Sequence, residues 1–312
     1  MKNFQSKQQG FTLLELLVVI TLLAVLAVGA LVAYDDVGDK AEGAAAAQSA
    51  VVADTAIRQF KAVTNAYPNQ WDNLAVGASL IDALPGALAD IIAPMSLGAA
   101  ASDVTGSLGR AGINELQYWL TPSAGNNATG VIPNLAHNES FNSVNAEEQE
   151  HWEDGGIGDD GPIPSIAVLR GLGTCAATGV AIPATLDDPD GAGPLVAGGN
   201  YLQNRYNDAL EGDECHLVVA LGFGSDAAAS TTGASVSIGK APSFSKTDAG
   251  NPENAVNPNT QYSRYIGLFW LGADADESGD ITGNEYFEKA RLIALIAPNG
   301  TIADQNLANA TK

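Results

Sequence analysis

The stretch GFTLLELLVVITLLAVLAVGALVAY, residues 10–34, decides the fold of this chain. After Gly10 it continues for 24 residues that include a single charged side chain, Glu15. As a helix with a rise of ~1.5 Å per residue, this run would be ~36 Å long, which is enough to cross a bilayer. A lone carboxylate in such a segment costs roughly 2.5–3.5 kcal/mol at mid-membrane. We therefore expect Glu15 to have a partner charge.

The residues on either side of this run indicate its orientation. Lys2 and Lys7 precede it without any acidic residue, whereas residues 35–39 include three aspartates. Basic residues on the N-terminal side alone place the N-terminus in the cytoplasm. An ordinary secretory signal ends in a small-residue cleavage site. Here Tyr34 and two aspartates follow the apolar run instead, so the conspicuous glycine is the one before it.

The basic leader, the Gly-Phe pair, the glutamate spacing and the apolar run together resemble the class III signal of type IV pilins and type II secretion pseudopilins. This resemblance implies that a prepilin peptidase cuts after Gly10 and that the new N-terminal residue, Phe11, is N-methylated. It also implies that Glu15 pairs with the N-terminal amine of a neighbouring subunit. The alternative is a plain membrane anchor with a chance match over about 25 residues.

One position departs from the pattern of this family. Many pilins carry a proline about 22 residues into the mature chain, where this sequence has Val32. The local weak points of the helix are Gly29 and Gly38. The position at which the helix bends or melts in a filament is therefore left open.

Size and charge limit the classes of function. The chain has 312 residues, a mass of 31.9 kDa and a formal net charge of −22, which becomes −24 when Lys2 and Lys7 leave with the leader. Such a surface repels nucleic acid and anionic lipid and attracts divalent cations. We therefore predict no nucleic-acid partner. The remaining length suits a membrane helix and one good-sized soluble domain.

The two cysteines, Cys175 and Cys215, suit an oxidising compartment outside the cytoplasm. A disulfide between them would close one loop and contribute ~4 kcal/mol on the chain-entropy model. We predict this disulfide, with two free thiols as the alternative.

The helix is predicted to continue well beyond the apolar run. No proline occurs before Pro68, and residues 41–56 are rich in alanine, which favours helix. Ala53, Ile57, Phe60 and further apolar residues up to Tyr67 keep a stripe at helical spacing. We predict one helix of roughly 55 residues whose first part, residues 11–34, is membrane-embedded. The second part, residues 35–67, is amphipathic and should lie on a sheet, although an independent helix or coiled coil is the alternative.

The head, residues 68–312, is rich in Gly, Ala, Asn, Asp and Ser over most of its length. Short apolar runs between turns predict strands at residues 115–120, 165–169, 215–223 and 235–238. Residues 126–164 are poor in aliphatic side chains and are predicted to form a long loop. The predicted class is α+β and pilin-like, with a long N-terminal α-helix packed on an antiparallel β-sheet head.

Residues 274–285 match the twelve-residue EF-hand calcium loop, with Gly279 at its sharp turn. The flanks, residues 265–271 and 290–297, are typical of strands rather than paired helices, with at most a turn of helix at residues 285–289. We therefore predict a structural calcium site between strands, with a solvated acidic turn as the alternative. Structural calcium is also known in the heads of pseudopilins. The predicted ligands are Asp274, Asp276, Ser278, Asp280, Thr282 and Glu285.

Signals of catalysis are poor, because the three histidines are scattered and no H-E-x-x-H, G-x-S-x-G or Walker A motif occurs. We therefore expect no enzyme. The expected function is a structural subunit that polymerises through its N-terminal helix into a type IV pilus or a secretion pseudopilus. Before assembly it would be anchored in the inner membrane. A pilus or type II secretion assembly platform would then add it to a periplasmic or extracellular filament. The alternatives are a minor or tip pilin, and a membrane-tethered calcium-dependent adhesin.

Overall fold

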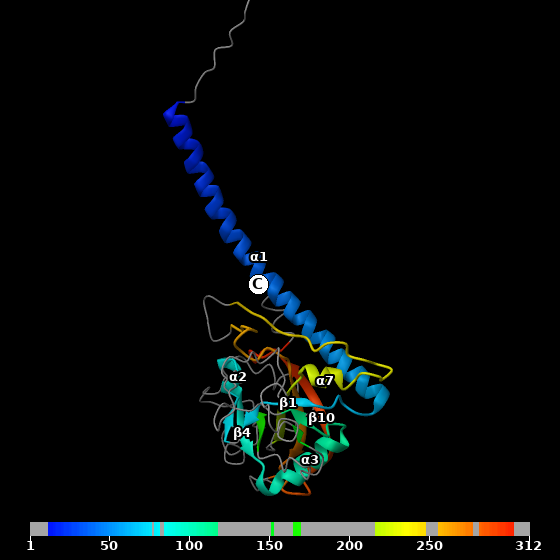
Figure 1. The fold of residues 1–312 in the computed structure, drawn as a ribbon. Coiled ribbons are helices and arrows are strands. Elements are labelled where there is room, and N and C mark those ends of the chain that lie inside the picture. Colours follow the sequence, from blue (N-terminus) through cyan, green and yellow to red (C-terminus); the bar gives the residue numbers. More distant parts are fainter. Residues whose placement is uncertain are drawn as a thin grey trace, which may run out of the picture.

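A single long helix, α1 (Leu13–Thr64), leads into a β-sheet head (Figure 1). The computed structural model describes residues 12–76, 78–81, 84–117, 151–152, 165–169, 216–247, 255–276 and 281–302. The shorter helices are α2 (Gly86–Ile91), η1 (Gly98–Ala100), α3 (Ala101–Arg110) and α7 (Ser225–Ala229). The strands are β1 (Trp71–Asn73), β2 (Ala75–Val76), β3 (Ser79–Leu80), β4 (Ile92–Ser96), β5 (Leu116–Gln117), β6 (His151–Trp152), β7 (Ser165–Leu169), β8 (His216–Gly222), β9 (Ile266–Ala273) and β10 (Tyr286–Ile296).

The predicted single helix is confirmed, since α1 runs for 52 residues without a break at its glycines. It ends three residues earlier than the predicted Tyr67. Asn65 adopts a left-handed conformation with φ 59°, and its N–H bonds back to the Lys61 carbonyl. Asparagine tolerates this conformation and so terminates a helix readily. The first half of α1 projects away from the head, and the second half lies along it (Figure 1).

The main sheet has the strand order β10-β9-β8-β1-β5-β6, and β7 pairs with both β8 and β4. Most neighbours are antiparallel, as predicted, but β1 and β5 are parallel. The sheet is therefore mixed. The prediction of a purely antiparallel sheet is wrong at this pair because β5 is joined to β1 through α2, β4 and α3, a crossover connection of the length that parallel strands need.

The head has a hydrophobic core on each face of the sheet. Alternate side chains of β8 illustrate this, because Val219 belongs to one core and Val218 to the other. Helices α1 and α3 cover the first face, through Ile57 and Leu108 among others. Helix α2 covers the second face through Leu88. Strands that are covered on both faces consist of continuous apolar residues, which explains why β7 and β8 could be predicted from the sequence.

The second half of α1 packs through a stripe at helical spacing, as predicted. Its buried residues are Ala46, Ala47, Ala50, Ala53, Ile57 and Phe60, and Tyr67 is buried just after the helix. Val63, which the prediction included among these apolar residues, is 59% exposed. Within the described part of the chain, the helix therefore contributes only a narrow face to the core.

Two further predictions in the head are wrong, and others lie outside the described residues. Residues 235–238 form a bend instead of a strand, where the Ile238 N–H donates to Thr231 Oγ1. Strand β6 falls inside the span predicted as a loop and pairs with β5. The strands predicted at residues 165–169 and 215–223 are confirmed as β7 and β8. Cys175 and Cys215 lie outside the described part of the chain, so their disulfide stays a prediction.

Candidate functional site

The N-terminal end of α1 carries the predicted assembly residue, Glu15. Thr12 is the N-cap, and its Oγ1 accepts a hydrogen bond from the Glu15 N–H at 3.3 Å. In return, Glu15 Oε2 accepts the Thr12 N–H and hydroxyl, each at 2.9 Å. This reciprocal capping box satisfies two donors at the helix start. Gly10 and Phe11 lie outside the described residues, so the cleavage and the pairing of Glu15 with a neighbour's amine stay predictions.

The first part of α1 presents an apolar surface that no described residue of the same chain covers. Leu13–Leu31 has a mean hydropathy of 2.7, and none of it is buried within the described structure. Leu13 is 84% exposed and Leu31 is 70% exposed, with long aliphatic side chains between them. An apolar surface of this size is unstable in water and marks a membrane or protein contact. The segment is also long enough to span a bilayer.

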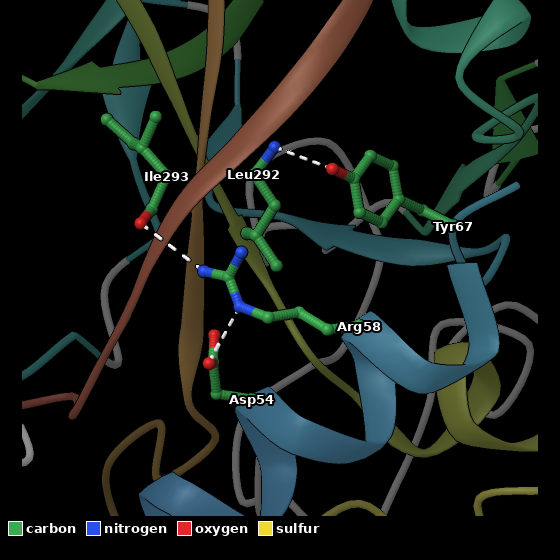
Figure 2. Close-up of polar contacts among 5 residues, drawn as sticks. All are labelled: Asp54, Arg58, Tyr67, Leu292 and Ile293. Atoms are coloured by element: carbon green, nitrogen blue, oxygen red, sulfur yellow. Dashed lines mark hydrogen bonds and ion pairs between the residues drawn. The ribbon is translucent and has the colours of Figure 1, made fainter. Parts of the chain in front are cut away.

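The C-terminal part of α1 is fixed to the free edge of the sheet, strand β10 (Figure 2). The Arg58 side chain pairs with Asp54 at 2.8 Å and donates to the Ile293 carbonyl at 3.4 Å. Just after the helix, the Tyr67 hydroxyl accepts the Leu292 N–H at 2.9 Å. An edge strand with unpaired backbone groups invites pairing with other chains. These two side chains occupy such groups on β10.

Further polar contacts join Tyr265 and Thr247 of the head to α1. The Tyr265 hydroxyl donates to the Ala46 carbonyl at 2.9 Å and also hydrogen-bonds the Ser49 hydroxyl. The Glu42 carboxylate accepts the Thr247 N–H at 3.2 Å and its hydroxyl at 3.1 Å. The residues of α1 from Glu42 onward are therefore an integral part of the head.

The acidic loop between β9 and β10 brings together three of the predicted calcium ligands. Carboxylate oxygens of Asp274, Asp276 and Glu285 lie within 4.8 Å of one another, and Asp274 is only 2% exposed. Ser278 and Asp280 lie outside the described residues. Thr282 is beside the cluster, but its N–H and hydroxyl both donate to Glu285 Oε2, at 2.8 and 3.2 Å. Three converging carboxylates suit a hard cation such as calcium.

The flanks of this loop are strands, as predicted. Strand β9 ends at Ala273 and β10 begins at Tyr286, so the loop connects two antiparallel neighbours. A turn of helix, which was the most that we expected at residues 285–289, does not form, because residues 286–289 belong to β10. A tight turn, in which the Glu285 N–H donates to the Thr282 carbonyl at 2.8 Å, leads directly into that strand. The Glu285 carboxylate is held by two further backbone N–H groups, those of Ala275 and Asp276.

A buried carboxyl group that the sequence did not reveal lies at the centre of the sheet. Asp72 on β1 is 6% exposed, and its Oδ2 accepts the Tyr262 hydroxyl at 2.6 Å. Burial raises the pKa of Asp72 to about 7, assisted by Asp226 and opposed by the Tyr262 hydrogen bond and Arg264. A Cβ on Gly224 would lie 2.4 Å from both carboxylate oxygens, so only glycine fits beside them. No spacing rule points to a single aspartate inside a three-residue strand.

Comparison with known proteins identifies the N-terminal region. Residues 5–31 match the family model described as the prokaryotic N-terminal methylation motif. No curated protein and no solved structure matches the chain. The match covers the capping box at Thr12 and Glu15 and all of the uncovered apolar surface.

Proposed function

We propose that this chain, whose residues 5–31 carry the class III prepilin signal of type IV pilins and pseudopilins, polymerises into a filament through α1. The observation that carries the proposal is a single helix with two different halves. Leu13–Leu31 is apolar and uncovered, while the half from Glu42 onward is bonded into the head. Stacked copies would bury the first half among parallel helices and display the heads outside.

The prepilin signal implies processing by a prepilin peptidase and assembly by a pilus-type system. In our proposal the cut falls between Gly10 and Phe11, and the new amine of Phe11 is methylated. Before assembly the apolar helix anchors the subunit in the inner membrane, with its N-terminus in the cytoplasm because Lys2 and Lys7 precede the helix. The subunit then passes into the filament on a pilus or type II secretion platform.

Glu15 favours an ordinary stacking subunit over a tip subunit. One of its oxygens caps its own helix, while Oε1 makes no hydrogen bond among the described residues. That oxygen is free to accept from the amine of a neighbouring copy. A subunit at the tip needs this acceptor less, since no copy lies above it. We therefore place the chain in the body of a pilus or pseudopilus, and the large head keeps a minor or tip role as the alternative.

We also propose that the β9–β10 loop binds calcium as a structural cofactor. The support comes from the twelve-residue ligand spacing together with the convergence of Asp274, Asp276 and Glu285. Without a cation these carboxylates repel one another in one short loop of a chain with a strong negative charge. A membrane-tethered calcium-dependent adhesin is the alternative function that this loop favours. We propose no enzymatic activity.

Electron microscopy of sheared surface fractions tests the proposed polymerisation. Cells that produce the chain together with its assembly system should release filaments that react with antibody against the head. Cells that lack the chain should lose these filaments. If the chain stays entirely in the membrane fraction while other filaments are released normally, the tethered adhesin is the better account. A chain found only at filament ends would identify a tip subunit.

A further inference from the structure

Basic side chains gather along the outer edge of β10. Among the 14 lysine and arginine residues of this acidic chain, five lie here. Two come from the end of α1, one from α3 and two from β10 itself. We call this group the basic edge, and its members are Arg58, Lys61, Arg110, Lys289 and Arg291.

The members of the basic edge are close enough to influence one another. Arg58 donates to the Ile293 carbonyl and Arg110 donates to the Glu288 carbonyl, at 3.4 and 2.6 Å, so both reach the same strand edge. Burial, and then the charges of the two β10 cations, lower the pKa of Lys61 below its ordinary value. The cluster is therefore a concentrated positive charge that repels itself.

Among the described residues, few carboxylates lie close to this positive charge. Within the described residues, Arg58 pairs with Asp54, and no carboxylate lies at ion-pair distance from Lys61, Lys289 or Arg291. Instead, aromatic rings make cation–π contacts with two of these side chains. The Lys61 ammonium lies 3.6 Å from the Tyr67 ring centre, and the Arg291 guanidinium lies 5.0 Å from that of Phe287. These rings hold the charges in place at the surface, where Lys289 and Arg291 are exposed.

The occupant that fits the basic edge is a second copy of this chain. Outside the edge, the mature protein has only seven lysine and arginine residues against 36 aspartates and glutamates. Any other copy therefore offers a predominantly acidic surface. Headgroups of the membrane that holds the helix are too distant, since Lys61 lies about 45 Å along α1 from Leu31. The phosphates of nucleic acid would be repelled by the acidic surface that surrounds the basic edge.

We infer that the basic edge is a contact surface between subunits, where it docks on an acidic surface of a neighbouring copy. This inference rests on the proposed polymerisation and adds a second contact to it, between heads instead of between apolar helices. Opposite charges at such a contact fix the register and suppress wrong partners. The contact should weaken at high salt, because the screening length falls from ~10 Å at 0.1 M to ~3 Å at 1 M.

Zero-length cross-linking with a water-soluble carbodiimide tests the inference on cells with assembled filaments. The reagent joins a lysine amine to a carboxylate that touches it. The wild type should give covalent dimers in which peptides containing Lys61 or Lys289 are linked to an acidic peptide of a second copy. The double variant Lys61→Arg with Lys289→Arg keeps the charge but has no reactive amine. It should lose these links and keep its filaments.

Charge reversal provides the functional readout. Lys289→Glu with Arg291→Glu should lower filament yield about tenfold, because each reversed charge now faces an acidic neighbour. Lys240→Glu is the matched control, since Lys240 is an exposed cation outside the basic edge, and its filament yield should equal that of the wild type. Thermal unfolding of each purified variant checks that the head still folds.

The outcomes separate the inference from the proposed function. Filaments without intermolecular links at Lys61 or Lys289, or a wild-type yield for the double reversal, overturn the basic edge and leave polymerisation standing. Links without filaments support the contact and contradict the proposed filament. Links from the lysines to anionic lipid or nucleic acid instead of to a second copy also overturn the inference.

Discussion

At the scale of single residues, Glu15 has one role that the structure shows and a second role that we propose. One oxygen caps the first turn of α1 through Thr12, which is a contact inside one subunit. The proposed pairing with a neighbour's amine needs the other oxygen. Because both tasks use the same carboxylate, a change at Glu15 alone removes both. A change at Thr12 removes only the capping hydroxyl.

We predict that Glu15→Ala or Glu15→Leu leaves membrane insertion intact and strongly reduces filament yield. Insertion becomes easier because a charge is removed from an apolar segment, whereas the attraction to the neighbour's amine is lost. Thr12→Val is the matched control, since it removes a cap of ~1 kcal/mol and keeps the carboxylate. Membrane fractionation and the yield of sheared filaments are the measurements. Equal yields for Glu15→Leu and wild type would exclude the pairing role.

The second prediction at this scale concerns the buried carboxyl of Asp72. Burial raises its pKa in the folded state to about 7, from an ordinary value of 3.8. Between these values the folded chain holds a proton that the unfolded chain has lost. The free energy of unfolding should therefore fall as pH rises from about 4 to about 7, by ~4 kcal/mol at most, and stay level above that.

Asp72→Asn should remove this part of the pH dependence, because asparagine keeps the shape and an acceptor for the Tyr262 hydroxyl but does not titrate. The measurement is urea unfolding of the purified mature protein and its variant across that pH range. The difference between the two unfolding free energies isolates Asp72 from the other groups that titrate. A difference that does not change with pH would show that Asp72 keeps an ordinary pKa.

At the scale of elements, the edge of β10 is protected by side chains instead of by another strand. The Tyr67 hydroxyl accepts the Leu292 N–H, and guanidinium groups of Arg58 and Arg110 donate to carbonyls of the same strand. A covered edge resists pairing with a foreign strand. The end of α1 therefore protects the head as well as packing on it.

We predict that Tyr67→Phe destabilises the protein by ~1–3 kcal/mol, because the buried Leu292 N–H loses its acceptor. Phenylalanine keeps the ring contact with Phe269, whose centre lies 5.2 Å away, so the change isolates the hydroxyl. Tyr286→Phe is the control, since the Tyr286 hydroxyl makes no hydrogen bond among the described residues. Urea unfolding compares the two. Equal, small effects would mean that water replaces the Tyr67 hydroxyl on β10.

The loop between β9 and β10 gives a further prediction at the same scale. Calcium that binds only the folded state stabilises it by roughly 2.7 kcal/mol at a hundred times its dissociation constant. The mature protein should therefore melt at a higher temperature in calcium than in chelator, and magnesium should substitute poorly. Asp274→Ala or Glu285→Ala should abolish the difference, whereas the exposed Asp90→Ala should keep it. Identical melting in calcium and chelator would reduce the loop to an acidic turn.

At the scale of the whole molecule, the long N-terminal helix and the apolar strands were predictable, whereas the shortest strands and helix α3 were not. Helix α1 and strands β7, β8 and β9 carry strong local patterns, because each is apolar on one stripe or buried on both faces. Strand β1 has three residues with an aspartate and an asparagine among them, and β6 has two, so neither shows a local signal. Their positions depend on partners far along the chain. The same holds for Asp72, whose burial comes from Tyr262 and Gly224.

The basic edge illustrates the same limit for function. Its five cations come from α1, α3 and β10, and the first and last of them are more than two hundred residues apart in the sequence. No continuous run of basic residues therefore predicts them. The N-terminal signal, in contrast, is a continuous pattern that can be read directly from residues 5–31. The sequence therefore indicates a pilus-type assembly system, and the structure adds how the head is fixed to the helix that carries the signal.

The most direct measurement of the central claim is the mass of the N-terminal peptide of this chain, taken from sheared surface filaments. The account predicts a peptide that begins at Phe11 and carries one N-terminal methyl group, with Gly10 and the leader removed. A chain recovered with Met1 at its start, or cut after the apolar run near residue 34, would contradict it, because neither form could assemble through the first half of α1.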